Sequence, residues 1–211
     1  MAITITAGAW TPSSGGAGPS VTLPASPAAG DLHVLYAGGK PFNTTINDIT
    51  GWTRITNVAG SNGSTGSGSD VGSVCQEAWY RYWVSGDGNP TVSLTGGGVF
   101  ECCLHRFRPT AGKTINTPVG AKGSDTSSGT DYAATMGSDI GITTDDAVVA
   151  YTVIAGNNSS FATPTLSATG VTFGTVSENP ATEGATSSGD DLGASASTAL
   201  PSAGPSSAAA V

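Results

Sequence analysis

Apolar residues along the chain fall into short runs separated by Gly, Pro, Asn, Asp and Ser, which is typical of strands joined by turns. No long stretch shows the 3.6-residue period of an amphipathic helix. The run at 31–37 (DLHVLYA) is nearly apolar on both of its alternating faces, and we expect it to be a central strand. The run at 99–108 (VFECCLHRFR) predicts a further strand, ended by Pro109.

The segment at 73–85 (SVCQEAWYRYWVS) has the best strand pattern in the chain. Because side chains alternate between the faces of a strand, one face is expected to carry Val74, Ala78, Tyr80, Tyr82 and Val84. The other face is expected to carry Cys75, Glu77, Trp79, Arg81 and Trp83. Both faces hold aromatic rings, so we expect neither to be plain solvent surface.

Further strand patterns lie at 3–6, 21–23, 52–58, 91–95 and 147–154, and weaker ones lie at 165–166 and 171–176. The segments expected to be loops lie at 11–20, 42–49 and 60–72. About eight to eleven short strands of this kind fit two packed antiparallel sheets. The predicted fold class is therefore all-β, an antiparallel β-sandwich that is jelly-roll-like and has long Gly/Ser-rich loops.

One β-sandwich domain is expected over residues 1–179. Beyond Pro180 the chain is almost entirely Ala, Ser, Gly, Thr and acidic residues. Residues 180–211 are therefore either a low-complexity C-terminal arm or the incomplete last strands of the same domain. In the first case we expect the arm to complete its pairing on a neighbouring subunit.

Composition and charge narrow the class of partner. Gly, Ala, Ser and Thr make up more than half of the 211 residues, and the formal net charge is −8. Such a surface repels phosphate backbones, so no nucleic acid partner is expected. No apolar run is long enough for a membrane span, so no membrane partner is expected. The net negative charge comes from residues 123–211, which contain no Lys or Arg. We interpret this part of the chain as a solvated acidic surface, and docking on a basic neighbour is the alternative.

The N-terminal sequence and the cysteines bear on the cellular compartment. The first residues, Met-Ala-Ile-Thr-Ile-Thr, lack the basic and apolar regions of a secretory leader, so none is expected. The cysteines are Cys75, Cys102 and Cys103. The adjacent pair would point to opposite faces of a strand, so a bond between them would strain the backbone. Reduced thiols that pack as small apolar side chains are expected.

Glu77 and Glu101 lie on separate expected strands with aromatic residues nearby, as in glycosidases of the β-sandwich class. A retaining glycosidase needs its two carboxyls about 5–5.5 Å apart, and an inverting one about 6.5–9.5 Å. Two half-exposed strand carboxylates that pair with Arg81 or Arg106 are the simpler interpretation. We therefore assign no catalytic residue.

Other candidate sites have simpler structural explanations. Cys103 and His105 share a face of their strand, which permits a Cys–His pair, but no oxyanion hole is marked beside them. Asp145-Asp146 and Asp190-Asp191 offer oxygens for calcium, but turn chemistry explains both pairs. Gly96-Gly97-Gly98 is interpreted as a hairpin turn, because no phosphate-binding Lys follows it. No metal and no cofactor is predicted.

The aromatic run Trp79-Tyr80-Arg81-Tyr82-Trp83 is the most informative feature of the chain. Trp, Tyr and Arg are the favoured anchors of protein interfaces. The residues Trp79, Arg81 and Trp83, together with Trp52, would equally form a platform on which a glycan stacks. Packing between two layers of the fold explains the face that carries Tyr80 and Tyr82, so no binding site is needed there. For the Trp face, the interface, the glycan platform and the packed core all stay open.

The order of short motifs resembles the small jelly-roll, lectin-like modules found in structural proteins of tailed bacteriophages. In those modules an apolar strand after Gly-Asp, a Gly-Trp-Thr turn and a Trp-Tyr-Arg strand recur. The matching segments here are 29–36 (AGDLHVLY), 51–53 (GWT), 78–81 (AWYR), 88–94 (GNPTVSL), 99–107 and 146–150 (DAVVA). The resemblance covers roughly residues 1–155, and each motif is short.

The resemblance implies a virion component without catalysis. The first expectation is a protein that decorates or cements the capsid through contacts with other virion proteins, such as the major capsid or tail proteins, and acts as a homo-oligomer. The alternative is a tail or fibre module that binds a host-surface glycan. Glycoside hydrolysis by Glu77 and Glu101 is a third hypothesis.

Overall fold

The fold is all-β in the computed structural model of this chain. The residues that the structure describes are 3–14, 18–40, 45–56, 58, 60–62, 74–95, 99–122, 143, 145–155, 165–180 and 192–203. Every regular element in these ranges is a strand, and every strand pairing is antiparallel. The predicted all-β, antiparallel class is therefore confirmed. Within the same ranges, no helix is long and apolar enough to cross a membrane.

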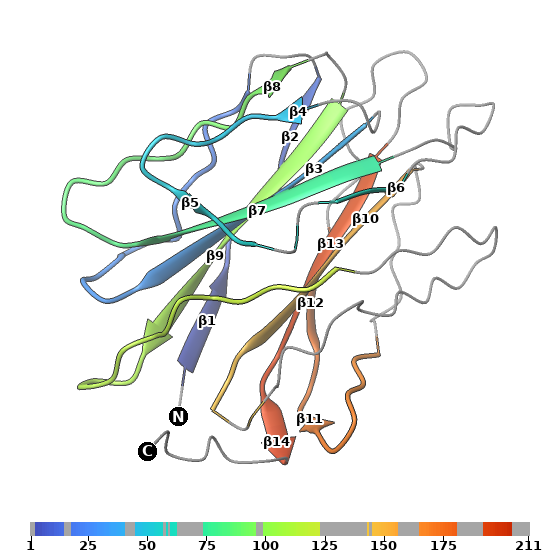
Figure 1. The fold of residues 1–211 in the computed structure, drawn as a ribbon. Coiled ribbons are helices and arrows are strands. Elements are labelled where there is room, and N and C mark those ends of the chain that lie inside the picture. Colours follow the sequence, from blue (N-terminus) through green and yellow to red (C-terminus); the bar gives the residue numbers. More distant parts are fainter. Residues whose placement is uncertain are drawn as a thin grey trace.

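The largest element is a seven-stranded sheet with β9, β3 and β7 side by side at its centre (Figure 1). Its path runs β1–β9–β3–β7–β5, while β2 pairs with β9 and β6 pairs with β7. The bounds are β1 Ile3–Ala7, β2 Thr11–Ser14, β3 Leu32–Lys40, β5 Thr53–Arg54, β6 Gly60–Asn62, β7 Val74–Tyr82 and β9 Val99–Pro109. Strand β3 is buried along its whole length, which confirms the central strand predicted at 31–37.

A second sheet of three strands packs against one face of the main sheet (Figure 1). Its order is β10–β13–β12, with bounds β10 Val148–Ala155, β12 Ser177–Pro180 and β13 Leu192–Ala199. The Tyr151 ring of β10 stacks on the Tyr36 ring of β3, with the ring centroids 5.1 Å apart. Gly38 of β3 allows β10 to approach this closely, because a Cβ at Gly38 would lie 2.4 Å from Val153 Cγ2.

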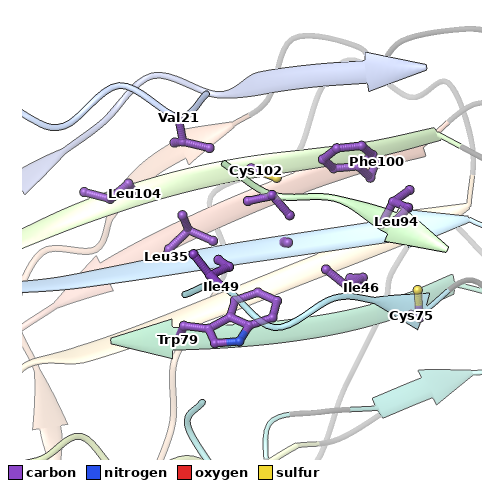
Figure 2. Close-up of a cluster of buried hydrophobic side chains, with 12 residues drawn as sticks. Val21, Leu35, Ile46, Ile49, Cys75, Trp79, Leu94, Phe100, Cys102 and Leu104 are labelled. Carbon is purple, nitrogen blue, oxygen red and sulfur yellow. The ribbon is translucent and has the colours of Figure 1, made fainter. Parts of the chain in front are cut away.

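The opposite face of the main sheet is covered by a short strand pair and by loops. The pair is β4 Thr45–Ile46 and β8 Leu94–Thr95. Leu35 of β3, Trp79 of β7 and Phe100 of β9 project into this layer (Figure 2). There they form one buried cluster with Ile46 and Leu94. The main sheet therefore carries an apolar core on each face, which explains why its central strands have no polar side.

Residues beyond 180 contribute strands to the same fold. Strand β13 lies between β10 and β12, and β14 (Pro201–Ala203) pairs with β11 (Thr172–Phe173). Ala194 and Ala196 of β13 are fully buried, and their small side chains let β13 lie close to the main sheet. The described part of 180–211 thus pairs within its own chain.

Short strands differ most from the sequence-based prediction. Residues 21–23, expected to be a strand, form no regular strand: Val21 N donates a hydrogen bond to Pro90 O at 2.8 Å, and the preceding Ser20 makes an isolated bridge with Thr91. Pro24 has no amide hydrogen, so the ladder cannot continue. Conversely, the expected loop 11–20 contains β2, because its residues find partners along the exceptionally long strand β9.

Candidate functional site

The two glutamates considered for glycoside hydrolysis project to opposite faces of the main sheet. Ala37 of β3 pairs with Glu77 of β7 and with Cys102 of β9. The next residue of β3, Gly38, pairs with Glu101. Residues in one cross-strand row share a face, so Glu77 points to the β4–β8 layer and Glu101 points to the second sheet. Two carboxylates placed in this way cannot flank one glycosidic bond.

Each of these glutamates has its own environment. Arg54 Nη1 donates a hydrogen bond to Glu77 Oε1 at 3.0 Å, so Glu77 is part of an ion pair. Glu101 is fully buried, and neither of its carboxyl oxygens has a hydrogen-bond partner. Burial raises the pKa of Glu101 to about 8, which keeps its carboxyl protonated at neutral pH.

Cys103 and His105 lie together as the sequence predicts, but inside the core. Cys103 Sγ and His105 Nδ1 are 3.6 Å apart, and the Tyr36 ring meets the His105 ring edge-on at a centroid distance of 5.8 Å. Both Cys103 and His105 are fully buried. Burial lowers the pKa of His105 to about 4, so the imidazole is neutral at pH 7. A nucleophile in this position has no access to substrate, and we interpret the pair as a core contact.

The predicted aromatic platform is wrong for Trp79. This side chain is fully buried in the cluster between the main sheet and the β4–β8 layer (Figure 2). The Arg54 guanidinium carbon lies 5.6 Å from the Trp79 ring centroid, so a cation covers one side of the ring. Trp83 follows the end of β7, is half-buried, and its ring meets the His33 ring edge-on at a centroid distance of 5.9 Å.

The structure brings the two other predicted site residues together. Trp52 and Arg81 line one open surface hollow of about 470 Å³, whose other walls come from the segments 48–52 and 86–93. The lining is mostly polar, with carboxylate, amide and hydroxyl groups beside the half-buried Trp52 ring. Sequence analysis singled out Trp52 and Arg81, but it did not foresee that the 86–93 segment would form the opposite wall.

Arg81 is fixed in this hollow by contacts on two sides. Its Nε donates to Asp87 Oδ2 at 2.9 Å, and its Nη2 donates to Asp87 Oδ1. Its Nη1 donates to the carbonyl oxygen of Gly51 at 2.8 Å. The hydrogen bonds from Arg81 lower the pKa of Asp87 and the same bonds raise the pKa of Arg81, so the pair stays ionised.

Gly51 is required at the point where Arg81 meets the Gly51–Trp52 turn. Its φ of +79° is one that residues with a side chain rarely adopt. A Cβ on Gly51 would also lie 2.2 Å from Arg81 Nη1. The backbone pairing of Thr53 with Tyr80 joins the same two segments. The Gly-Trp-Thr and Trp-Tyr-Arg motifs are therefore parts of one local structure.

The opposite wall of the hollow is tied to the N-terminal part of the chain. The backbone N–H of Leu23 donates to Asn89 Oδ1 at 3.0 Å. Pro90 is buried, and its carbonyl oxygen accepts the hydrogen bond from Val21. Asp87 Oδ2 accepts a hydrogen bond from Val84 N at 3.0 Å, which closes the turn at 84–87. The 88–94 motif is thereby tied to residues 21–23, and it lines the same hollow as Trp52 and Arg81.

The acidic pairs give no metal site in the described residues. Asp146 Oδ2 accepts hydrogen bonds from Thr143 N at 2.7 Å and from Thr143 Oγ1 at 2.9 Å, which is turn chemistry as predicted. Asp190-Asp191 and Gly96-Gly97-Gly98 lie outside the described residues. Across the part that the structure describes, no group of three His, Cys, Asp or Glu side chains is placed to hold a metal ion.

The cysteines that the structure describes form no disulfide and are buried, as expected for small packing side chains. Cys102 belongs to the cluster under the β4–β8 layer, while Cys103 faces the second sheet. A second, larger hollow of about 590 Å³ is formed by residues 165–176 alone and includes none of the predicted site residues. The Trp52–Arg81 hollow is therefore the candidate functional site.

Comparison with known proteins gives no relative. No family model, no curated protein and no solved structure matches the chain.

Proposed function

We propose that this chain is a non-enzymatic structural protein of a bacteriophage virion, which decorates or cements the capsid through protein–protein contacts. The observation that supports the proposal is the convergence of the resembling motifs. The turn at 51–53 and the strand at 78–81 are joined by the Thr53–Tyr80 pairing and by the hydrogen bond from Arg81 to Gly51, and the segment at 88–94 lines the same hollow. Motifs that form one structural unit are better grounds for a resemblance than the same motifs scattered over a fold.

Co-sedimentation with capsids tests this proposal. The purified chain is mixed with phage heads that lack it, and bound protein is measured after pelleting. Saturable binding at a fixed number of copies per capsid is the expected result, because a decorating protein occupies equivalent lattice positions. Binding that does not saturate, or no binding, contradicts decoration.

A second candidate function is a tail or fibre module that binds a host-surface glycan. The specific observation in its favour is the hollow itself, which combines Trp52, a fixed guanidinium and several amide and hydroxyl groups. Small-ligand sites are concave surfaces with a few fixed polar groups of this kind. A screen of the intact chain against immobilised glycans tests it, and a screen without any hit removes this candidate.

A further inference from the structure

The charges around the Trp52–Arg81 hollow are balanced within the protein. Arg81 is the cation in the lining, and its Nε, Nη1 and Nη2 are all engaged by Asp87 and by the Gly51 carbonyl. The other lining carboxylate, Asp48, accepts a hydrogen bond from Arg54 Nε at 3.0 Å and forms an ion pair with the same guanidinium, whose Nη2 lies 2.8 Å from Asp48 Oδ1. The lining therefore offers an anionic ligand no cation that is free of a carboxylate partner.

An acidic ligand would also meet repulsion. The lining carboxylates Asp48 and Asp87 are each paired with an arginine, so the lining adds no attraction for an anion, and the whole chain carries a formal net charge of −8. Like charges placed across a contact disfavour binding and slow association. Sugars that carry a carboxylate, sulfate or phosphate are thus the wrong partners for this hollow.

A neutral sugar fits the groups that line the hollow. The Asp48 and Asp87 carboxylates accept hydrogen bonds from hydroxyls, and the Asn89 amide both donates and accepts. The exposed Thr50 and Thr91 add hydroxyl groups at the rim. The Trp52 side chain packs against the buried cluster and remains partly exposed, so it offers an apolar surface to the C–H face of a pyranose.

The hollow is also built before any ligand arrives. Its two walls are fixed by the Arg81–Asp87 pair, the Arg81–Gly51 contact and the Leu23–Asn89 hydrogen bond. Groups that are already fixed lose little conformational entropy on binding. This arrangement separates a binding site from a chance depression between mobile loops.

We propose that the Trp52–Arg81 hollow binds the neutral hexose or N-acetylhexosamine units of a glycan and rejects acidic sugars. The proposal rests on the second candidate function, that the chain binds glycan. It adds the class of sugar and the residues that select it.

The test uses isothermal titration of the full chain with two sets of probes. The neutral set is the methyl glycosides of glucose, galactose, mannose and N-acetylglucosamine. The acidic set is glucuronic acid and N-acetylneuraminic acid. Trp52→Ala removes the apolar surface of the hollow. Trp83→Ala is the matched control, because Trp83 is a half-buried Trp of the same layer that lies outside the hollow.

The expected result is binding of at least one neutral probe, weakened roughly tenfold or more by Trp52→Ala and unchanged by Trp83→Ala. Circular dichroism of both variants shows whether each is folded. If Trp52→Ala does not fold, crosspeak shifts of the Trp52 indole on titration of the unaltered chain locate the ligand instead. Neutral binding that Trp83→Ala weakens as much as Trp52→Ala contradicts the assignment to this hollow.

The two levels of the proposal fail differently. Binding of the acidic set in preference to the neutral set, still lost in Trp52→Ala, overturns the sugar class and leaves glycan binding in place. Absence of binding to either set, in titrations and on immobilised glycans alike, overturns glycan binding itself and the sugar class with it.

Discussion

At the scale of single residues, Arg81 and Gly51 define the candidate site. The guanidinium of Arg81 bridges the Asp87 carboxylate and the Gly51 carbonyl, so one side chain joins the two walls of the hollow. Glycine is required at position 51 for two reasons, because the residue has a positive φ and because a Cβ there would collide with Arg81. The Arg81–Asp87 ion pair is partly exposed, so it adds little to the free energy of unfolding. Its role is to hold Arg81 in position between the two walls.

Replacing Gly51 by Ala is expected to destabilise the chain and to loosen Arg81. Gly86→Ala is the matched control, because Gly86 has a similar φ of +95° and nothing would lie within 4 Å of a Cβ added there. Both variants bear the cost of about 1 kcal/mol or more for a side chain at positive φ. Gly51→Ala should lose additional stability in urea unfolding, since its Cβ also collides with Arg81. Equal losses in the two variants would show that Arg81 does not occupy the observed position.

Glu101 gives the chain a pH-dependent stability. Below about pH 4.5 its carboxyl is protonated in both the folded and the unfolded chain and has no effect. As the pH rises from about 4.5 to about 8, the unfolded chain loses this proton first, so the free energy of unfolding falls. Each unit of pKa difference corresponds to ~1.4 kcal/mol, so the total loss amounts to a few kcal/mol.

Glu101→Gln is therefore expected to be more stable than the unaltered chain at pH 8 and to differ little from it near pH 4.5. Denaturant unfolding at several pH values measures this difference. Asp48→Asn, which removes an exposed carboxylate that pairs with Arg54, is the control and should not be more stable than the unaltered chain at pH 8. A pH profile that Glu101→Gln does not flatten contradicts the buried, unpaired position of this carboxyl.

The candidate site was only half predictable at this scale. Trp52 and Arg81 are recognisable because large aromatic and guanidinium groups are common in recognition sites. Trp79 looks the same in sequence, yet the register of β7 with β3 and β5 places it under Arg54 and Leu35. The alternation of side chains along a strand predicts which residues share a face. It does not predict which part of that face is buried under the next layer and which part stays at the surface.

At the scale of elements, the second sheet depends on small residues that face the main sheet. Gly38 makes room for Val153 and Tyr151 of β10, and Ala194 and Ala196 bring β13 into the same layer. These residues explain why a segment rich in Ala, Ser and Gly forms a buried strand. A larger side chain on either surface would hold the sheets apart.

Gly38→Ala is expected to destabilise the chain by about 1–3 kcal/mol, because the added methyl group overlaps Val153 and the Tyr151 hydroxyl. Gly88→Ala is the matched control, since nothing lies within 4 Å of a Cβ there and its φ is not in the left-handed region. Thermal unfolding of the two variants measures the difference. If Gly38→Ala melts at the same temperature as Gly88→Ala, β10 does not lie against β3 as described.

The strands rich in large apolar side chains were predictable, whereas β13 was not. Strands β3, β7, β9 and β10 contain enough Val, Leu, Phe and other aromatic residues to be recognised as strands from the sequence. Strand β13 has the sequence LGASASTA, and its pairing with β10 and β12 depends on neighbours that are far away in the chain. Tertiary pairing of this kind overrides local propensity, so the segment's own sequence does not identify it as a strand.

At the scale of the whole molecule, two features bear on assembly. The main sheet is covered on both faces, so partners are expected to contact edges, loops and the Trp52–Arg81 hollow rather than an open sheet face. The excess negative charge lies in residues 123–211, so a partner surface that docks there would be basic. Capsid binding that uses this charge should weaken as ionic strength rises, since salt screens such contacts.

The location of the chain in an intact particle tests the central claim most directly. A reconstruction of the virion by electron cryo-microscopy, with the β3–β7–β9 sheet fitted to the density, measures this location. Capsid decoration predicts copies on the outer lattice of the head, in symmetric groups. Density for the chain only at the tail or fibre would transfer support to the glycan-binding function. Its absence from purified particles that are otherwise complete would contradict a structural role in the virion.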